Sequence, residues 1–369
     1  MSGQAHTKSG RSRLAAPAPA DGAPAVTTPV PRRIWEEALR SDPAAVVSQG
    51  LAWRDAVLAG GGYADASLLY EFGGGRRVVV PMASHRRLPD WVDVAGSWPA
   101  RWGVAGPISP DGKVTDEEAA VILADLTARW PLGVEIQFRH GAAGQWLRQA
   151  AGYTAEYRTC HVLDLTGGFS QVWQDKFAGT ARTAVRKAEK SGVTVERDGA
   201  GRLLGVFSDL YDKSIQRWAE GQHEPVWLAR WRTLRATPPK MLEAVSESFA
   251  GDCQVWVARL DGEPVASIIV LKAGGYAKYW RGAMDRDPAT RSRANDLLHK
   301  LAIEDACADG RSSYDMGGSR PGSPLARFKE KLGAEPFAAF TLRAEKIPVR
   351  SAAETSRKWA KKAIGFRDI

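Results

Sequence analysis

A β-hairpin in the second half of the chain constrains the fold more than any other segment. Residues 254–260 and 265–272 are rich in β-branched and other apolar side chains, and Asp261-Gly262 lies between them. An Asp-Gly pair favours a two-residue type I′ turn, because both of its positions need a positive φ. The sequence therefore predicts two antiparallel strands at this point.

The elements around this hairpin follow a specific order. We expect helices at 169–191, 203–218, 293–308 and a short one ending at Gly333, with further strands at 193–197, 276–282, 312–316 and 337–343. The order is helix, helix, three antiparallel strands, helix, strand, helix, strand. It differs from a regular βαβ alternation and indicates a mixed α+β class.

The first half repeats this mixture of helices and antiparallel strands. Residues 66–72 and 76–83 resemble a hairpin, and Thr115-Asp-Glu-Glu resembles a capping box at the start of a helix. A chain of 369 residues exceeds what one core usually holds. We therefore expect a disordered Ala/Pro-rich tail, two globular units and a basic C-terminal segment, at 1–31, 32–160, 161–348 and 349–369.

Charge and cysteine content narrow the class of protein. A net charge of +9 favours a polyanionic partner: nucleic acid, an anionic membrane surface or a phosphorylated substrate. The three cysteines, Cys160, Cys253 and Cys307, are far apart and suggest neither a disulfide framework nor a zinc site. No run of about 18 apolar residues is present, so no spanning helix is expected. These features indicate a reduced, cytoplasmic protein.

Short segments of the second half carry a family resemblance: 181–193 (ARTAVRKAEKSGV), 279–283 (YWRGA), 314–317 (YDMG) and 327–333 (RFKEKLG). They resemble the GCN5-related acyltransferase (GNAT) fold, and in particular the catalytic domain of the FemAB-like family. These peptidoglycan bridge-forming enzymes transfer amino acids from aminoacyl-tRNA onto peptidoglycan precursors. The first half is similar to the family's other, degenerate GNAT-like domain at 49–53 (QGLAW) and 102–107 (WGVAGP). The resemblance implies two tandem GNAT-like domains, each a mainly antiparallel sheet flanked by helices.

The segment expected to hold coenzyme A departs from the usual pattern. An ordinary GNAT enzyme binds the diphosphate of this cofactor on backbone N–H groups at a helix start, with the pattern R/Q-x-x-G-x-G/A. Here residues 291–296 (RSRAND) lack both glycines, and Asp296 adds negative charge beside the expected phosphate. Coenzyme A is therefore disfavoured, and we expect aminoacyl-tRNA as the co-substrate, with no other cofactor and no metal.

The resemblance also implies where catalysis takes place. Phe328-Lys329 matches the family's Phe-Lys pair, whose lysine lies near the tRNA acceptor end and the developing oxyanion. Phe328 is expected beneath the terminal adenosine. From the residues alone, Lys329 is an exposed lysine on a basic helix face. Asp315 is a candidate acceptor for the amine proton, and an equally good interpretation has it cap the loop at Gly317 and Gly318.

The expected acceptor is a muramyl peptide that carries a diphosphate, or another amine. Paired arginines suit a diphosphate. Arg217 and Tyr211 on the second helix and Tyr279 on a strand lie where the family uses an arginine and tyrosines. Arg182 and Arg186 are alternatives, although a solvated helix face explains either of them as well.

Three functions follow from these expectations. The first is an aminoacyl-tRNA-dependent aminoacyltransferase that forms an amide bond on a peptidoglycan precursor or a peptide-like metabolite. The second is an acyl-CoA or other thioester-dependent N-acyltransferase in polysaccharide or envelope biosynthesis. The third is an inert GNAT-like module that binds RNA or membrane through its basic C-terminal segment. We expect a monomer whose partners are charged tRNA, the amine acceptor and, peripherally, an anionic membrane.

Overall fold

The computed structural model describes residues 23–85, 94–99, 102–142 and 144–345. Most of the expected N-terminal tail and the whole basic segment 349–369 lie outside these residues. Among the helices in the described ranges, none combines the length and apolar character needed to cross a membrane.

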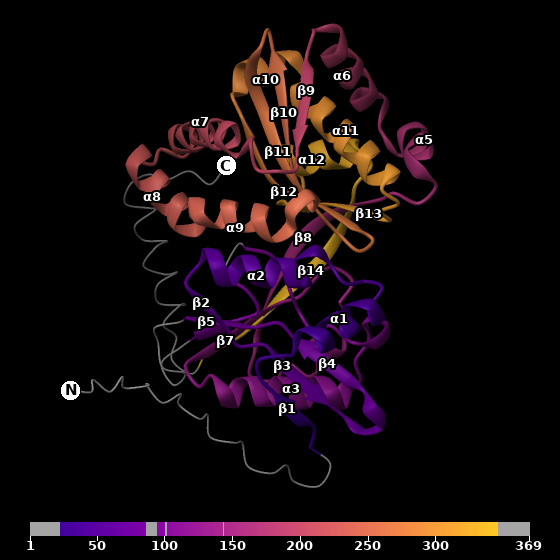
Figure 1. Ribbon diagram of the computed structural model, residues 1–369, viewed down its shortest axis with the longest axis vertical. Coiled ribbons are helices and arrows are strands. Elements are labelled where there is room, and N and C mark those ends of the chain that lie inside the picture. Colours follow the sequence, from indigo (N-terminus) through magenta and orange to yellow (C-terminus); the bar gives the residue numbers. More distant parts are fainter. Residues whose placement is uncertain (1–22, 86–93, 100–101, 143, 346–369) are drawn as a thin grey trace, which may run out of the picture.

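Eleven of the described strands form one sheet that runs through both halves of the chain (Figure 1). Their order along the sheet is β2 (Tyr63–Asp65), β5 (Ala83–His85), β6 (Val94–Gly96), β7 (Gly133–Gln137), β14 (Glu335–Ala344), β8 (Thr154–Asp164), β13 (Ser313–Gly318), β12 (Tyr276–Met284), β11 (Glu263–Ala273), β10 (Cys253–Leu260) and β9 (Thr194–Asp198). Neighbouring strands are antiparallel except β6–β7 and β12–β13. The sheet is thus mainly antiparallel, as predicted. Each half also contains one parallel pair, which was not predicted.

Two central strands connect the halves. β14, the last strand of the chain, lies between β7 and β8, and β8 pairs on its other side with β13. The expected boundary between residues 160 and 161 falls inside β8. The domain boundary between residues 160 and 161 therefore stays a prediction.

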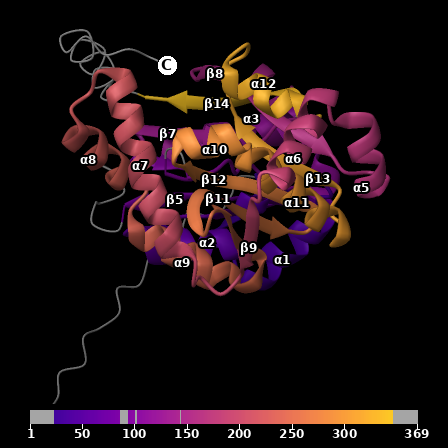
Figure 2. The ribbon, with the colours of Figure 1, turned by 90° about the horizontal axis from the view of Figure 1, so that it is seen from above.

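Helices cover both faces of the sheet in the second half. Figure 2 shows α7, α8 and α9 on one side of the strands and α5, α6 and α11 on the other. The helices are α1 (Arg32–Ser41), α2 (Leu51–Gly60), α3 (Asp116–Arg129), α4 (Gln145–Arg148), α5 (Gly168–Gln171), α6 (Gly179–Lys190), α7 (Leu204–Gln222), α8 (Val226–Ala236), α9 (Pro239–Phe249), α10 (Arg286–Ser292), α11 (Ala294–Ala308) and α12 (Pro324–Lys331). Side chains of β10 alternate between the two layers: Val255 and Val257 belong to one core, Trp256 and Ala258 to the other.

Local sequence signals predict several of these elements correctly. Asp261 and Gly262 have φ values of 52° and 83°, which a type I′ hairpin turn requires. At the start of α3, Thr115 Oγ1 accepts from the Glu118 N–H at 3.1 Å, and Glu118 Oε2 accepts from the Thr115 N–H at 2.8 Å. The hairpin and the capping box are both confirmed.

A second, smaller sheet corrects the prediction for the N-terminal segment. It contains β1 (Ala25–Thr27), β3 (Leu68–Glu71) and β4 (Arg77–Val80). Residues 1–31 are expected to be disordered, but β1 pairs with β3, and Val30 is buried with its N–H donating to Ser67 Oγ at 3.0 Å. Composition does not reveal this pairing, because the hydrogen-bond partner is 37 residues away in the sequence.

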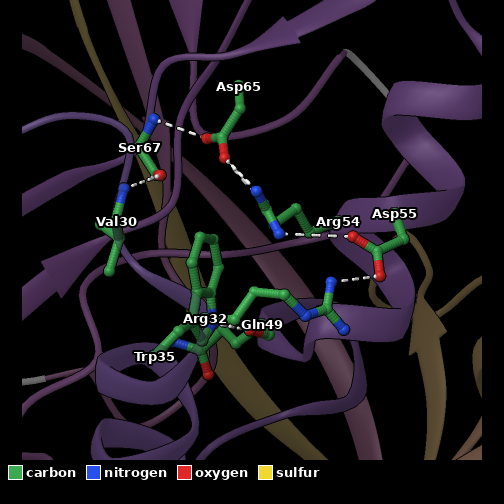
Figure 3. Close-up of polar contacts among 8 residues, drawn as sticks. All are labelled: Val30, Arg32, Trp35, Gln49, Arg54, Asp55, Asp65 and Ser67. Atoms are coloured by element: carbon green, nitrogen blue, oxygen red, sulfur yellow. Dashed lines mark hydrogen bonds and ion pairs between the residues drawn. The ribbon is translucent and has the colours of Figure 1, made fainter.

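Polar contacts hold this part of the first half together (Figure 3). Asp65 accepts from Arg54 Nε at 2.8 Å and from the Ser67 N–H at 2.9 Å. Trp35 Nε1 donates to the Gln49 carbonyl at 2.9 Å. These bonds hold α2 against β2, and α1 against the turn that precedes α2.

The prediction of a single helix at 169–191 is wrong, because the helix is interrupted between α5 and α6. A π-helical turn (Val172–Lys176) follows α5, and Phe177 is extended, with φ −69° and ψ 126°. The Ala178 N–H donates to the Lys331 carbonyl at 2.9 Å instead of continuing the helix. Arg182 Nη1 then donates to three carbonyls of the preceding turn, those of Trp173, Gln174 and Phe177.

An aromatic core joins the two halves. α2 packs against α9 (Figure 1). Trp53 lies edge-to-face against Phe249 and Trp280, with ring centroids 6.3 and 5.6 Å apart. The core at this interface therefore contains residues from both expected units.

Candidate functional site

The site begins where β12 and β13 separate. The two strands pair from Tyr276 and Ser313 to Lys278 and Asp315. Beyond that pair β12 continues to Met284 and β13 to Gly318, but the two strands no longer pair with each other. The two strands therefore separate after this pair, and we call the region between their ends the wedge.

An ion pair closes the narrow end of this wedge. Lys278 Nζ lies 2.6 Å from Asp315 Oδ2, and the Asp315 side chain is buried. Burial opposes the charge on both groups. Their mutual attraction outweighs it, so the pKa of Lys278 is raised and the pKa of Asp315 is lowered. Both partners are thus charged at neutral pH.

Asp315 also orders the end of its own strand, β13. Its Oδ1 accepts from the Gly317 N–H at 2.6 Å and from Cys160 Sγ at 3.3 Å. The first contact matches the loop-capping interpretation of this residue. A carboxylate with a lowered pKa is a weak base, so the same geometry does not favour proton abstraction by Asp315.

Lys329 points into the wedge, which corrects its expected exposure on the surface of α12. Its side chain is 1% exposed, and Nζ donates to the carbonyls of Gly317 and Gly318, both at 2.9 Å. Burial lowers the pKa of Lys329 to about 8. An ammonium has three N–H donors. Among the described residues, the Gly317 and Gly318 carbonyls take two of these donors.

The register of α12 explains this correction. The sequence predicts that Leu325, Phe328 and Leu332 face inward. Leu332 is buried and Phe328 half-buried, as predicted, but Leu325 is half exposed. Ala326 and Lys329 are buried instead. The Ser323 hydroxyl accepts from the Ala326 N–H at 3.1 Å and so begins the helix there. At the start of the helix, the buried position is therefore Ala326 and not Leu325, one residue later than predicted.

Four aromatic rings line the wedge beside Lys329. His299 lies edge-to-face against Tyr279, Phe328 and Tyr314, at centroid distances of 4.7, 5.4 and 6.2 Å. Burial lowers the pKa of His299 to about 3, and the charge of Lys329 contributes. His299 is therefore a neutral packing residue.

The start of α11 contains an internal carboxylate. Asp296 is 4% exposed, and its two oxygens pair with Lys331 Nζ and, at 3.2 Å, with Arg293 Nε. This is the position at which GNAT enzymes are expected to bind a diphosphate. A buried carboxylate there repels an incoming phosphate and occupies two of the nearby cations.

A polar cavity of about 150 Å³ lies between α7, α8 and β12. It is lined by Tyr211, Trp218, Gln222, Arg232, Thr233, Ala236, Thr237 and Arg281. Burial raises the pKa of Tyr279 to about 12, and Arg281 and Tyr211 also act on this group. Arg281, which lines the cavity, lies two residues after Tyr279 on β12.

The structure brings together only some of the predicted site residues. Lys329, Phe328, Asp315 and Tyr279 surround the wedge, and Tyr211 lines the neighbouring cavity. Arg217 Nη1 donates to the Met284 carbonyl at 3.0 Å, outside the cavity lining.

The two arginines predicted on α6 are further away. Arg182 caps the helix break described above, and Arg186 is exposed. α6 covers the opposite face of the sheet from α7 (Figure 2). Neither side chain joins the wedge.

Sequence reasoning missed three residues of the wedge. Lys278 lies just before the YWRGA segment. A lysine within an otherwise apolar strand was the sequence signal that could have identified it as a site residue. Cys160 and His299 have no signal in the sequence, because their neighbours come from distant segments. Burial raises the pKa of Cys160 to about 12, so this thiol stays protonated. Among the described residues, no three His, Cys, Asp or Glu side chains form a metal-binding group.

Known proteins share this architecture. Residues 175–331 match the family described as an acetyltransferase (GNAT) domain. A comparison with curated protein sequences gives no significant match. Among solved structures the chain is similar to FemX, with a TM-score of 0.63 and 13% identity over 86% of this chain and 96% of that chain.

Two further solved structures are similar over most of their lengths. L-PGS from Bacillus licheniformis gives a TM-score of 0.52 and 14% identity, over 95% of this chain and 100% of that chain. A conserved protein of unknown function from Bacteroides thetaiotaomicron gives a TM-score of 0.53 and 6% identity, over 86% and 98%. These similarities confirm the predicted fold of two tandem GNAT-like units. They also confirm the resemblance to FemAB-like enzymes at the level of the fold.

Proposed function

We propose that this protein, which has a GNAT acetyltransferase domain and a fold shared with FemX, is an aminoacyl-tRNA-dependent aminoacyltransferase. It forms an amide bond on an amine of a peptidoglycan precursor or a peptide-like metabolite. The observation that carries the proposal is the buried Lys329 ammonium, which the Gly317 and Gly318 carbonyls hold where β12 and β13 separate.

The proposed reaction needs little from the protein beyond positioning and charge stabilisation. The acceptor amine attacks the ester carbonyl of the charged tRNA. The N–C bond forms, the C–O bond to the ribose breaks, and the amine proton passes to the ribose oxygen. The third N–H of Lys329 stabilises the tetrahedral oxyanion, and burial strengthens this contact. The protonated Cys160 thiol supports direct transfer over a covalent thioester.

Asp315 is proposed as a positioning residue. Its carboxylate holds the Gly317 N–H, and the Gly317 and Gly318 carbonyls hold Lys329 Nζ. Phe328 is proposed to contact the terminal adenosine. Its ring is half-buried, and the Lys331 ammonium lies 4.8 Å from the ring centroid.

The neighbouring cavity is the proposed acceptor site. Its lining includes Arg232, Arg281 and Tyr211, which suit a polar or anionic group. Tyr279 is proposed to lie between this cavity and Lys329. An acceptor bound there is directed toward the proposed ester site.

The test is transfer of a radiolabelled amino acid from charged tRNA to an amine acceptor by the full-length protein. We expect transfer that RNase abolishes, and that Lys329→Met reduces while Lys190→Met, on the exposed face of α6, does not. Transfer that survives RNase treatment contradicts the proposed donor.

An acyl-CoA-dependent N-acyltransferase is the second candidate, because the matched family is described as an acetyltransferase domain. The Asp296 carboxylate at the start of α11 argues against it. Calorimetry with coenzyme A separates the two. Micromolar binding favours this candidate, and the absence of binding favours aminoacyl-tRNA.

A further inference from the structure

α8 exposes an apolar stripe on its outer face. Trp227, Trp231 and Leu234 are 71%, 55% and 40% exposed. They recur at i, i+4 and i+7, which places them on one side of the helix. On the other side Ala229 is buried. Figures 1 and 2 both show α8 at the periphery of the molecule.

Arginines flank this stripe. Residues 226–240 contain four basic side chains, Arg230, Arg232, Arg235 and Lys240, and no acidic one. Arg230 and Arg235 lie on either side of the stripe by helical spacing. The Arg235 guanidinium lies 5.3 Å from the Trp231 ring centroid, and Arg230 pairs with Asp212 on α7.

This combination suits a lipid headgroup region better than RNA. Indole rings prefer the membrane–water interface, because they have an apolar body and a polar N–H. Arginine guanidinium groups bind phosphates at the same depth. Leu234 gains by insertion among acyl chains but gains nothing from stacking on a nucleic-acid base.

We propose that α8 is an interfacial docking helix that binds an anionic lipid surface through Trp227, Trp231 and Leu234, with Arg230 and Arg235 contacting lipid phosphates. The opposite side of the same helix lines the polar cavity with Arg232, Thr233 and Ala236. Docking through α8 therefore places this cavity just beneath the lipid headgroups. The inference rests on the helix alone and not on the proposed reaction.

The experiment is co-sedimentation of the full-length protein with vesicles of phosphatidylcholine, with and without phosphatidylglycerol. We expect binding to the anionic vesicles that weakens with salt, and a loss of at least about tenfold in Trp227→Ala/Trp231→Ala. Arg230→Gln/Arg235→Gln is expected to weaken binding to anionic vesicles only. Tyr157→Ala is the matched control, because Tyr157 is another exposed aromatic residue (65%) on β8, away from α8.

Three results overturn the proposal. The first is vesicle binding by the double tryptophan variant at the parent level, which assigns lipid binding to another segment. The second is a parent dimer that the variant converts to a monomer, which assigns the stripe to a second copy. The third is loss of tRNA binding with unchanged vesicle binding. Because the changed side chains are exposed, the circular dichroism of the variants should match the parent and so exclude misfolding.

Discussion

Lys329 combines burial with a retained positive charge. Two backbone carbonyls and a protein interior replace its hydration, and its pKa falls to about 8. A lysine in this state is sensitive to pH in a range where ordinary lysines are not. The oxyanion contact proposed above depends on the protonated form.

The rate of transfer should therefore fall as pH rises through about 8, when Lys329 loses its proton. The acceptor amine acts in the opposite direction, since its neutral form increases with pH, so the descending limb reports Lys329. Lys329→Met should lower kcat by about 10²–10³, as for the loss of one oxyanion donor. Measurement of kcat against pH is the check. A Lys329→Met enzyme that keeps the parent rate and the descending limb would show that another group is responsible.

The Lys278–Asp315 pair makes a separate prediction about stability. Asp315→Asn leaves a buried ammonium without its partner and should lower the free energy of unfolding by about 3–5 kcal/mol at pH 7. Because the pKa of Asp315 is lowered in the folded state, its contribution is complete above the ordinary carboxyl range and is lost as pH falls below it. The deficit of the variant should therefore shrink in acid.

Urea unfolding of the single and double variants measures this effect. Lys278→Met/Asp315→Asn removes both charges and should recover much of the lost stability. If the double variant is as unstable as the sum of the two single variants, the pair is not coupled and the prediction fails.

At the scale of elements, Gly282 determines where Tyr279 can lie. A Cβ at this position would overlap the Tyr279 hydroxyl and come within 3.0 Å of its Cζ. Tyr279 packs against His299, so its ring has little freedom to move away. Gly282→Ala should destabilise the fold by about 1–3 kcal/mol. Thermal unfolding checks this. In a Tyr279→Phe background, which removes the overlapping hydroxyl, the cost should be smaller.

Elements with local determinants could be predicted from the sequence. The Asp261-Gly262 turn and the Thr115 capping box each depend on side chains within a few residues. The break before α6 depends instead on the Lys331 carbonyl, more than 150 residues away, and no local pattern marks it. The exposure of Lys329 was predicted wrongly for the same reason, since the carbonyls that accept from it belong to Gly317 and Gly318 at the end of β13.

At the scale of the whole molecule, the strand order couples the two halves. β14 lies next to β7, although the chain between them contains the second half. β8 ends the first half and pairs with β13 of the second. The sequence indicated two similar units, but it did not indicate that each contributes to the sheet of the other, because strand pairing across such distances leaves no periodic signal.

The aromatic core between the halves should make unfolding cooperative. Trp53 contacts Phe249 and Trp280, so Trp53→Ala opens a cavity at the interface and should cost about 3–5 kcal/mol. The parent and the variant should each unfold in a single urea transition, with fluorescence and circular dichroism coinciding. Trp227→Ala is the control, since this exposed side chain should change stability by less than about 0.5 kcal/mol. Two resolved transitions in the parent would mean that the shared sheet does not couple the halves.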